Sequence, residues 1–327
     1  MKILKETLKS LPHPKRRLIN MYKHIPVLLN ECINGLNIKP NGKYIDATLG
    51  RGGHSSVILS KLQNGQLYCF DQDSQAIEES YDRLKKISPN FKLIHANFSS
   101  IKEKMAELEI DQVDGVLFDL GVSSAQFDEG DRGFSYRFDA RLDMRMNVAN
   151  SLSAYDVVNN YSIKELTRIF KEYGEEKFAY QIASNIVKKR QVKPIETTFE
   201  LVEIIKATLP NKVLSQKGHP AKQVFQAIRI EVNDELSALK RGLKGALDIL
   251  ASKGRICVIT FNSLEDRIVK NIFKECTFEG EGSRYLPSEK KNVDFVLVNR
   301  KIILPSIDEM EINPRSKSAK LRIIERK

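Results

Sequence analysis

One stretch near the N-terminus constrains the fold more than any other, because an apolar run, a glycine cluster and a helical pattern follow one another directly. Residues 43–49 alternate as a buried strand does and are flanked by turn residues. Gly50, Gly52 and Gly53 can adopt positive φ and carry no Cβ, so backbone N–H groups can approach a ligand where the next helix begins. This order is typical of a nucleotide-type cofactor site.

The glycine turn differs from the two best-known phosphate-binding motifs. Residues 50–55 match neither the G-x-G-x-x-G turn of dehydrogenases nor the G-x-x-x-x-G-K-[S/T] phosphate loop. Glycine clusters also end strands in folds that bind nothing there. The turn alone therefore leaves a cofactor site and a structural turn equally open.

A second predicted strand, residues 66–73, ends in acidic residues. Asp71 comes 18 residues after Gly53, and an acidic residue about 20 positions beyond such a turn is placed to accept hydrogen bonds from ribose hydroxyls. The alternative is a cap for the helix that begins at Ser74. Asp73 suits the cap, whereas Asp71 suits the ribose.

Strand and helix patterns alternate onward through strands 91–98 and 113–120. This rhythm predicts an α/β fold with a doubly wound, Rossmann-like sheet. Only helical patterns follow as far as Gly218, then a long helix over 220–252 and a strand over 254–262. We expect a sheet domain made of 21–121 and 219–327, with a helical domain, 122–218, inserted in it. Runs near 277–280 and 294–303 would form a closing hairpin.

The composition says more about the binding partner than about the fold. Lys and Arg number 53 against 42 Asp and Glu, a formal net charge of +11, which favours nucleic acid, with anionic membranes and simple solubility as competing explanations. No apolar run is long enough to span a bilayer. Residues 1–20 are basic and lack a secretory apolar stretch; we expect a disordered RNA-contacting extension, with an organelle transit peptide as the alternative. The four cysteines are scattered, which indicates a reducing compartment and no cysteine metal site.

Asp119 ends the fourth predicted strand, at the same sheet edge as the glycine turn. A carboxylate there can hydrogen-bond an amino group of a cofactor or of a substrate base, or serve as a cap or turn residue. The segment that follows alternates arginine with aromatic residues. This suits phosphate contacts and base stacking, and equally a salt-bridged surface loop. Its candidate RNA-binding residues are Arg132, Phe134, Tyr136, Arg141 and Arg145.

Nine motifs occur in one order from about residue 22 to residue 326, and together they resemble the RsmH (MraW) family. They are residues 46–55, 119–124, 132–135, 142–146, 173–177, 219–221, 225–230, 263–267 and 313–322. Members of that family are S-adenosylmethionine-dependent methyltransferases that modify N4 of a cytidine in the decoding region of bacterial small-subunit ribosomal RNA. The resemblance implies S-adenosylmethionine as cofactor and small-subunit rRNA, or the assembled small subunit, as partner. It also implies that the inserted helical domain recognises RNA.

Carried over position by position, the resemblance implies a cofactor site made of Gly52, Gly53, His54, Asp71, Phe98, Asp119 and Gln126. Asp119 is also the candidate catalytic residue, and no metal is expected. Two positions depart from the family pattern. Asn262 stands where members often have His, which puts a catalytic role for that position in doubt, and Leu49 stands where Phe is usual.

Two other functions remain compatible with these patterns. A nicotinamide dehydrogenase would share the sheet and the ribose acid, but it would require the G-x-G-x-x-G turn. A non-catalytic RNA-binding ribosome-assembly factor could keep the fold without turnover. We expect a cytoplasmic protein, with an organellar matrix as the alternative. The oligomeric state, including a homodimer, is left open.

Overall fold

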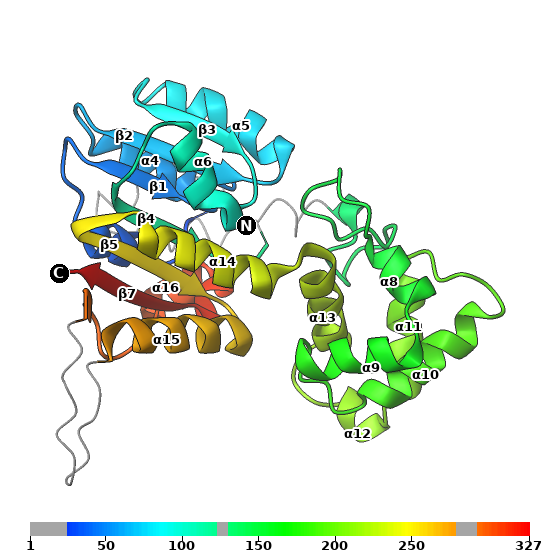
Figure 1. Ribbon diagram of the computed structural model, residues 1–327. Helices are drawn as coiled ribbons and strands as arrows, with labels where there is room; N and C mark the ends of the chain where they lie inside the picture. Colours follow the sequence, from blue (N-terminus) through cyan, green and yellow to red (C-terminus); the bar gives the residue numbers. More distant parts are fainter. Residues whose placement is uncertain (1–24, 123–129, 279–292) are drawn as a thin grey trace, which may run out of the picture. The chain divides into compact units, whose positions relative to one another are not determined.

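The computed structural model describes residues 25–122, 130–278 and 293–327 (Figure 1). The chain divides into two compact units. The first, here the sheet unit, comprises the residues up to Gly121 together with Lys240–Lys327, and the second, the helical unit, comprises Val122–Leu239. The helical unit is thus an insertion between two halves of the sheet unit.

The sheet unit follows the predicted alternation of strands and helices. Its strands are β1 (Lys43–Asp46), β2 (Gln66–Asp71), β3 (Phe91–His95), β4 (Val113–Asp119), β5 (Leu250–Thr260), β6 (Phe295–Leu297) and β7 (Lys320–Arg326). Its helices are α3 (Leu29–Leu36), α4 (Gly53–Ser60), α5 (Ser74–Lys85), η1 (Phe98–Ser100), α6 (Ile101–Glu107), α14 (Glu235–Asp248), α15 (Ser263–Thr277), α16 (Ile307–Ile312) and η3 (Pro314–Ser318).

All seven strands belong to one sheet with the order β3-β2-β1-β4-β5-β7-β6. The first five strands in this order run parallel to one another, whereas β7 runs antiparallel to both β5 and β6. This confirms the doubly wound fold class. An antiparallel pair closes the sheet as expected, but β6 and β7 form it: Thr277 ends α15, and residues 279–280 lie outside the described parts of the chain.

Helices cover the sheet on both faces (Figure 1). One apolar cluster joins α3 and α4 to the strands, with Tyr44, Leu67 and Leu117 buried in it. Elsewhere α14 packs on the segment that follows β3, because Gly242 leaves room for the ring of Phe98; a Cβ there would lie 2.7 Å from that ring. Close packing therefore fixes the segments that follow β1 and β3.

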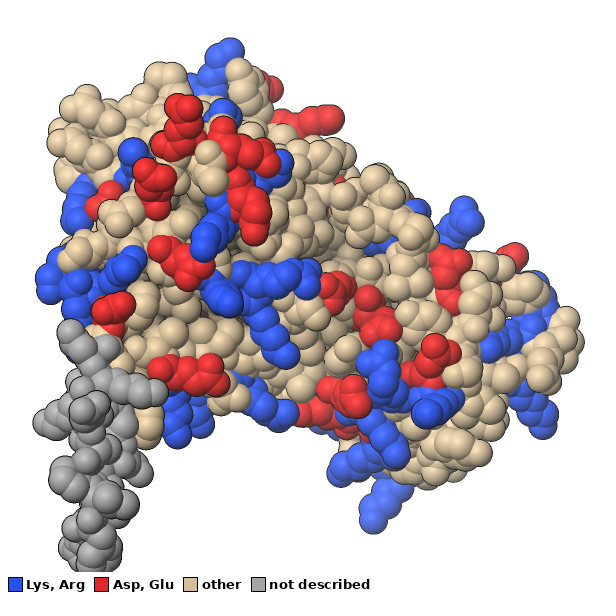
Figure 2. Space-filling view, in the orientation of Figure 1, with Lys and Arg blue, Asp and Glu red and all other residues tan. Residues whose placement is uncertain are grey.

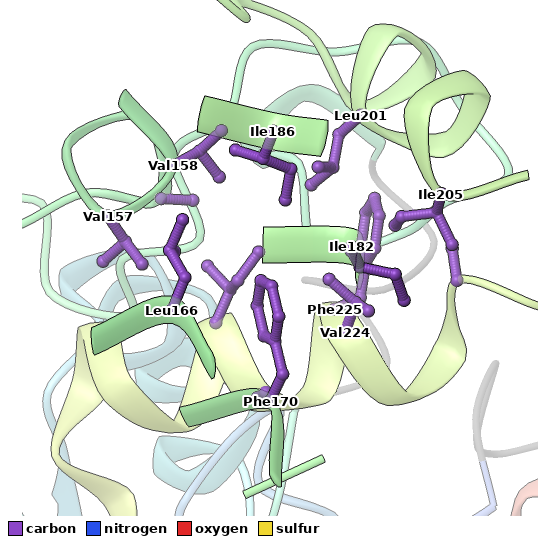
Figure 3. Packing of buried hydrophobic residues seen from close by; sticks show 14 of the residues in the cluster. Val157, Val158, Leu166, Phe170, Ile182, Ile186, Leu201, Ile205, Val224 and Phe225 are labelled. Atoms are coloured by element: carbon purple, nitrogen blue, oxygen red, sulfur yellow. The ribbon is translucent and has the colours of Figure 1, made fainter. Parts of the chain in front are cut away.

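The helical unit is built on well-capped helices around its own core. It contains η2 (Gly130–Arg132), α8 (Ala154–Asn160), α9 (Ile163–Glu172), α10 (Ala179–Arg190), α11 (Thr198–Thr208), α12 (Asn211–Leu214), α13 (Lys222–Asn233) and the start of α14. Ser153, Ser162 and Thr197 each begin a helix with a capping box, which satisfies N–H groups of the first turn. Figure 3 shows buried side chains of these helices converging, Phe170 and Phe225 among them.

The structure corrects two expectations about the end of the insertion. The long helix over 220–252 is in fact two helices, because Asp234 adopts a left-handed conformation with φ 48° and ends α13. The side chain of Asn233 also bonds the backbone of Met144 and Met146 there. Since α13 packs in the core of the helical unit, that unit extends to Leu239 and not only to residue 218.

Candidate functional site

Three acidic residues end adjacent parallel strands. Asp46 is the last residue of β1, Asp71 of β2 and Asp119 of β4, and β1 pairs with both other strands. Carboxyl ends of parallel strands share one edge of a sheet, where open α/β folds bind their ligands. The strand ends predicted from the sequence for Asp71 and Asp119 therefore lie at this edge.

The glycine turn connects β1 to α4 in a conformation that favours glycine. Gly50 has φ 50° and Gly52 has φ 71°, and Gly52 is the N-cap of α4. A Cβ on Gly53 would lie 2.5 Å from Cγ of Pro26. The turn is thus closely packed and leaves the first N–H groups of α4 at the carboxyl edge of the sheet.

Asp71 holds this turn in place. Its Oδ2 accepts a hydrogen bond from the Gly50 N–H at 2.8 Å, and its Oδ1 accepts one from the Asp73 N–H at 2.9 Å. Burial raises the pKa of Asp71 to about 6. Asp73 accepts from the Gln75 N–H and caps α5, in the role expected for it. Each oxygen of Asp71 retains a lone pair, so the turn contact is compatible with a ribose contact.

His54 is buried and neutral. Its Nε2 lies 3.0 Å from the carbonyl oxygen of Val27, which can only accept, so Nε2 carries the proton. Burial lowers the pKa of His54 to about 4. Its Nδ1 lies 3.6 Å from Oδ2 of Asp119. Because the imidazole is neutral at pH 7, these two groups are not an ion pair.

Of the three carboxylates at this edge, Asp119 is the one least satisfied by hydrogen bonds within the described structure. Its Oδ1 is inaccessible to water and has no hydrogen-bond partner among residues 25–122, 130–278 and 293–327, although a quarter of the side chain is exposed. Burial raises the pKa of Asp119 to about 8, and the charges of Asp46 and Glu265 add to the effect. An unpaired carboxyl oxygen in such a place is costly unless a ligand group satisfies it.

Asp46, by contrast, is fully engaged inside the protein. It is 1% exposed, and it accepts hydrogen bonds from the Ser55 hydroxyl at 2.6 Å and the Thr48 N–H at 3.1 Å. The Thr48 hydroxyl in turn accepts from the Asp119 N–H at 2.7 Å. Asp46 therefore orients the turn and the end of β4, whereas Oδ1 of Asp119 has no hydrogen-bond partner in the described structure.

Phe98 begins η1 directly after β3, and its ring is half-buried. It packs edge-on against Phe118 with ring centroids 5.6 Å apart. That contact and Gly242 fix the ring near the site edge, where an adenine contact was predicted. Gln126, the last predicted cofactor residue, lies outside the described residues.

The predicted RNA-binding residues have mainly internal contacts. Phe134 is 4% exposed and belongs to the core of the helical unit, so it is not an exposed stacking ring. The guanidinium of Arg132 donates to the carbonyls of Arg145 and Met146. Arg145 forms a two-bond pair with Asp143 at 2.7 and 2.9 Å. Of these three residues, Arg145 forms the kind of ion pair that a salt-bridged loop would contain, Arg132 bonds backbone carbonyls, and Phe134 is a core residue.

Tyr136 and Arg141 remain predictions. Arg141 is exposed, and Tyr136 is half-buried and stacks on His219, with ring centroids 4.1 Å apart and planes 8° apart. His219 was given no role from the sequence. The signal that could have found it is the absence of acid from residues 204–230, a segment that contains His219 and several lysines.

Asn262 has a structural role. Its side chain caps α15 by accepting from the Leu264 and Glu265 N–H groups at 3.0 and 2.9 Å. Glu265 completes the capping box. Asn, which stands here where the family often has His, is thus a residue that caps a helix well.

The model of the MraW methylase family matches residues 21–327. The chain belongs to the MraW methylase family. Its cofactor is accordingly S-adenosylmethionine. The site fits such a ligand, because it combines a close-packed glycine turn with an unpaired carboxyl oxygen that can face the positive charge of a sulfonium or ammonium group.

Curated relatives extend the match over nearly all of the chain. The ribosomal RNA small subunit methyltransferase H of Mesoplasma florum is 54% identical over 94% of this chain and 100% of its own length. The proteins of that name from Streptococcus dysgalactiae and Clostridioides difficile are 52% and 51% identical over 92% and 93% of this chain, and over 97% and 99% of their own lengths.

A solved structure of an rRNA methylase from Streptococcus thermophilus covers 93% of this chain and 98% of its own, at 13% identity and a TM-score of 0.42. This likeness is too weak to add to the family assignment. Across the described residues of this member of the MraW methylase family, helices are too short or too polar to cross a membrane. The same residues contain no group of three or more His, Cys, Asp or Glu that could hold a metal ion.

Proposed function

We propose that this protein transfers the methyl group of S-adenosylmethionine to N4 of a cytidine in the decoding region of small-subunit ribosomal RNA. Its relatives from three bacteria carry the name of a small-subunit rRNA methyltransferase at 51–54% identity. The net charge of +11 suits a polyanionic substrate. The cytidine and its position follow from the resemblance of the sequence motifs to the RsmH (MraW) family.

The observation that carries the chemical part is the unpaired oxygen of Asp119. The exocyclic amine of cytosine is a poor nucleophile, because its lone pair is delocalised into the ring. A carboxylate that accepts one of its hydrogens favours pyramidal nitrogen and stabilises the positive charge that develops on attack. Oδ1 of Asp119 is an acceptor without a protein partner in the described structure, at the edge where the ligands bind.

Positioning accounts for the rest of the catalysis. S-adenosylmethionine supplies an already activated methyl group, so the protein has to hold the amine in line with it and exclude water. Gly52, Gly53 and His54 would bind the methionine end, Asp71 the ribose and Phe98 the adenine. Gln126 remains a predicted contact. Because the cofactor is a cation, its charge would favour the ionised form of Asp119 against the burial that raises the pKa of this carboxyl to about 8.

The helical unit would recognise the RNA. Target cytidines in structured RNA have to be unstacked before an enzyme can reach N4, and a separate domain can hold the flanking nucleotides. Tyr136 and Arg141 remain its predicted contacts from the sequence. The substrate is either the naked small-subunit rRNA or the assembled subunit.

The direct test incubates the full chain and methyl-labelled S-adenosylmethionine with small subunits that lack the modification, and in parallel with naked rRNA. Label on N4 of one cytidine, mapped by nuclease digestion and mass spectrometry, is the expected result. Label on another atom or on another RNA would contradict the assignment. The two substrates, compared under the same conditions, also show whether an assembled subunit is required.

A non-catalytic assembly factor is the second candidate, and the same site distinguishes the two. A pure binding protein would have no use for a buried, unpaired Asp119, since an internal hydrogen bond would make the fold more stable. Replacing Asp119 by Ala, with cofactor affinity and methyl transfer measured separately, decides its role. Lost transfer with intact cofactor affinity makes Asp119 catalytic, whereas unchanged transfer removes it from the mechanism.

A further inference from the structure

A ring stack marks one surface of the helical unit. Tyr136 and His219 lie parallel, with centroids 4.1 Å apart, although they are 83 positions apart in the chain. Phe225, which is buried, meets Tyr136 edge-on at 5.8 Å and fixes that ring from the core side. Both rings of the stack are only half-buried. The protein thus holds a fixed pair of flat rings at its surface.

The surroundings of His219 leave it open to a ligand. A Cβ on Gly218 would meet no atom of the described chain within 4 Å. The Nδ1 of His219 accepts from the Ala221 N–H at 3.2 Å, so Nε2 carries the proton of the neutral ring and can donate outward. Burial lowers the pKa of His219, and the charges of Lys206 and Arg137 add to this. Two cations therefore lie close to the stack.

Helix α11 extends this surface to two more rings. Phe199 and Lys206 are seven residues apart, which places them on one face of the helix, ~10 Å apart along its axis. Beside the start of α11, the Thr198 hydroxyl donates to the Phe138 carbonyl at 2.6 Å. Phe138 and Phe199 are 46% and 44% exposed, so two large apolar rings are open to solvent where their backbones meet.

Charge alone does not single out this surface. Figure 2 shows Lys and Arg side chains mixed with Asp and Glu over the face that it displays. Lys206 itself pairs with Glu203 at 2.9 Å. Two acids also lie at this surface, Glu203 and Asp139, whose Oδ1 accepts from the Phe199 N–H at 3.3 Å. What distinguishes the α11 surface is therefore the combination of exposed rings with cations. Duplex RNA hides its base faces, whereas single-stranded RNA offers them for stacking.

We propose that the aromatic–basic surface formed by Tyr136, Arg137, Phe138, Phe199, Lys206 and His219 binds single-stranded RNA, with bases stacked on its rings and phosphates facing its two cations. This inference rests on the proposed function, since it gives the RNA substrate a place on the helical unit. Arg132 and Arg145 are engaged internally, so we expect this surface, and not those two arginines, to make the main RNA contact.

The test measures binding of the full chain to a short, fluorescein-labelled single-stranded RNA of mixed sequence, by polarisation at fixed salt. His219→Ala and the double variant Phe138→Ala, Phe199→Ala are each expected to weaken binding roughly 5- to 100-fold, the loss of about one stacked base. His219→Phe keeps a ring and should keep most of the affinity. Arg137→Ala should reduce the salt dependence of binding.

Matched controls lie elsewhere on the same unit. Tyr180 on α10 is 60% exposed and lies outside the surface, so Tyr180→Ala should leave RNA affinity unchanged. Lys164→Ala on α9 is the corresponding control for charge. Thermal melting of each variant verifies that it is folded.

Several outcomes overturn the inference without touching the proposed function. If the surface variants bind RNA as tightly as wild type does, this surface does not bind RNA. If wild type binds a duplex as tightly as the single strand, base stacking does not contribute to binding. If the variants raise KM for assembled subunits but bind RNA normally, the surface contacts a ribosomal protein instead. Conversely, if wild-type protein binds the RNA through this surface but transfers no methyl group, the proposed function is wrong while the surface inference holds.

Discussion

The glycine-turn site of the sheet unit and the arginine loop of the helical unit, residues 130–146, both carry sequence patterns that suggest ligand binding, but they are built in opposite ways. At the glycine turn, Oδ1 of Asp119 is buried without a partner in the described structure. In the arginine loop, Asp143 and Arg145 form a two-bond pair, and Arg132 donates to two backbone carbonyls.

The comparison shows what a row of charged residues does and does not indicate. Charges that satisfy one another hold a loop with little regular secondary structure, because its backbone carbonyls still need donors. A carboxyl oxygen that is buried and unsatisfied costs free energy in the ligand-free protein, and a ligand can recover it. We therefore expect substitutions at the first site to change the chemistry and substitutions in the loop to change stability.

The largest effect is expected when one carboxylate in each region, Asp119 or Asp143, is replaced by an amide. Asp119→Asn is expected to lower kcat for methyl transfer by ~10²–10³, because the neutral amide lacks the negative charge that meets the positive charge developing on N4. Asp143→Asn weakens the pair with Arg145 and should leave kcat per folded molecule near that of wild type. Single-turnover transfer, with active protein titrated by cofactor binding, measures both. A similar loss of kcat in the two variants would abolish the contrast between the two regions.

The pH dependence of stability should separate the same two carboxylates. Burial raises the pKa of Asp119 to about 8, above its unfolded value, so the folded protein retains a proton that the unfolded chain has lost. Its contribution therefore destabilises the fold progressively as pH rises from about 4 to about 8. Asp119→Asn removes this penalty and should be increasingly more stable than wild type over that range.

Asp143 should behave in the opposite way. The hydrogen bonds and charge of Arg145 hold its pKa below the ordinary value against burial, so its contribution to stability is present at neutral pH and is lost on acidification. Melting temperatures of wild type, Asp119→Asn and Asp143→Asn across pH measure both trends. A stability difference between Asp119→Asn and wild type that does not change with pH would contradict the raised pKa.

A smaller effect is expected from the arginine that ties the loop. Arg132→Met retains most of the apolar stem but removes the donors to the Arg145 and Met146 carbonyls. We expect a loss of about 1–3 kcal/mol of unfolding free energy, since a buried carbonyl is left unsatisfied. Urea unfolding monitored by circular dichroism measures it. Cofactor affinity, the control readout, should not change, because Arg132 is not among the predicted cofactor residues.

Much of this fold could be predicted from the sequence, because its signals are local. Alternating strands, Gly50 to Gly53 and the capping residues at Ser162 and Thr197 specify the sheet and the helix starts within a few residues. The family resemblance and the cofactor were confirmed by the match over residues 21–327. The position of Asp71 and Asp119 at one edge follows from strand order, which the alternation already implies.

What could not be predicted depends on contacts between distant residues. Helical periodicity continues through residues 220–252, and only the bonds from Asn233 to Met144 and Met146 reveal why the chain breaks at Asp234. Likewise, nothing local distinguishes buried Phe134 from half-exposed Tyr136, two positions later. Arg132 was ambiguous for the same reason, since its acceptors are the carbonyls of Arg145 and Met146 and no pattern of side chains marks these.

The smallest effect should come from Asn262, which lies near the site but serves a helix. Asn262→Ala removes the acceptor for the Leu264 and Glu265 N–H groups and should cost about 0.5–2 kcal/mol of stability. Asn262→Ser supplies another good cap and should recover most of that loss. If the position took part in the chemistry, both variants would instead lose methyl transfer at full folding, because neither can supply the carboxamide. Urea unfolding and single-turnover transfer on the two variants therefore separate a capping role from a catalytic one, and we expect stability to follow the cap while the transfer rate stays constant.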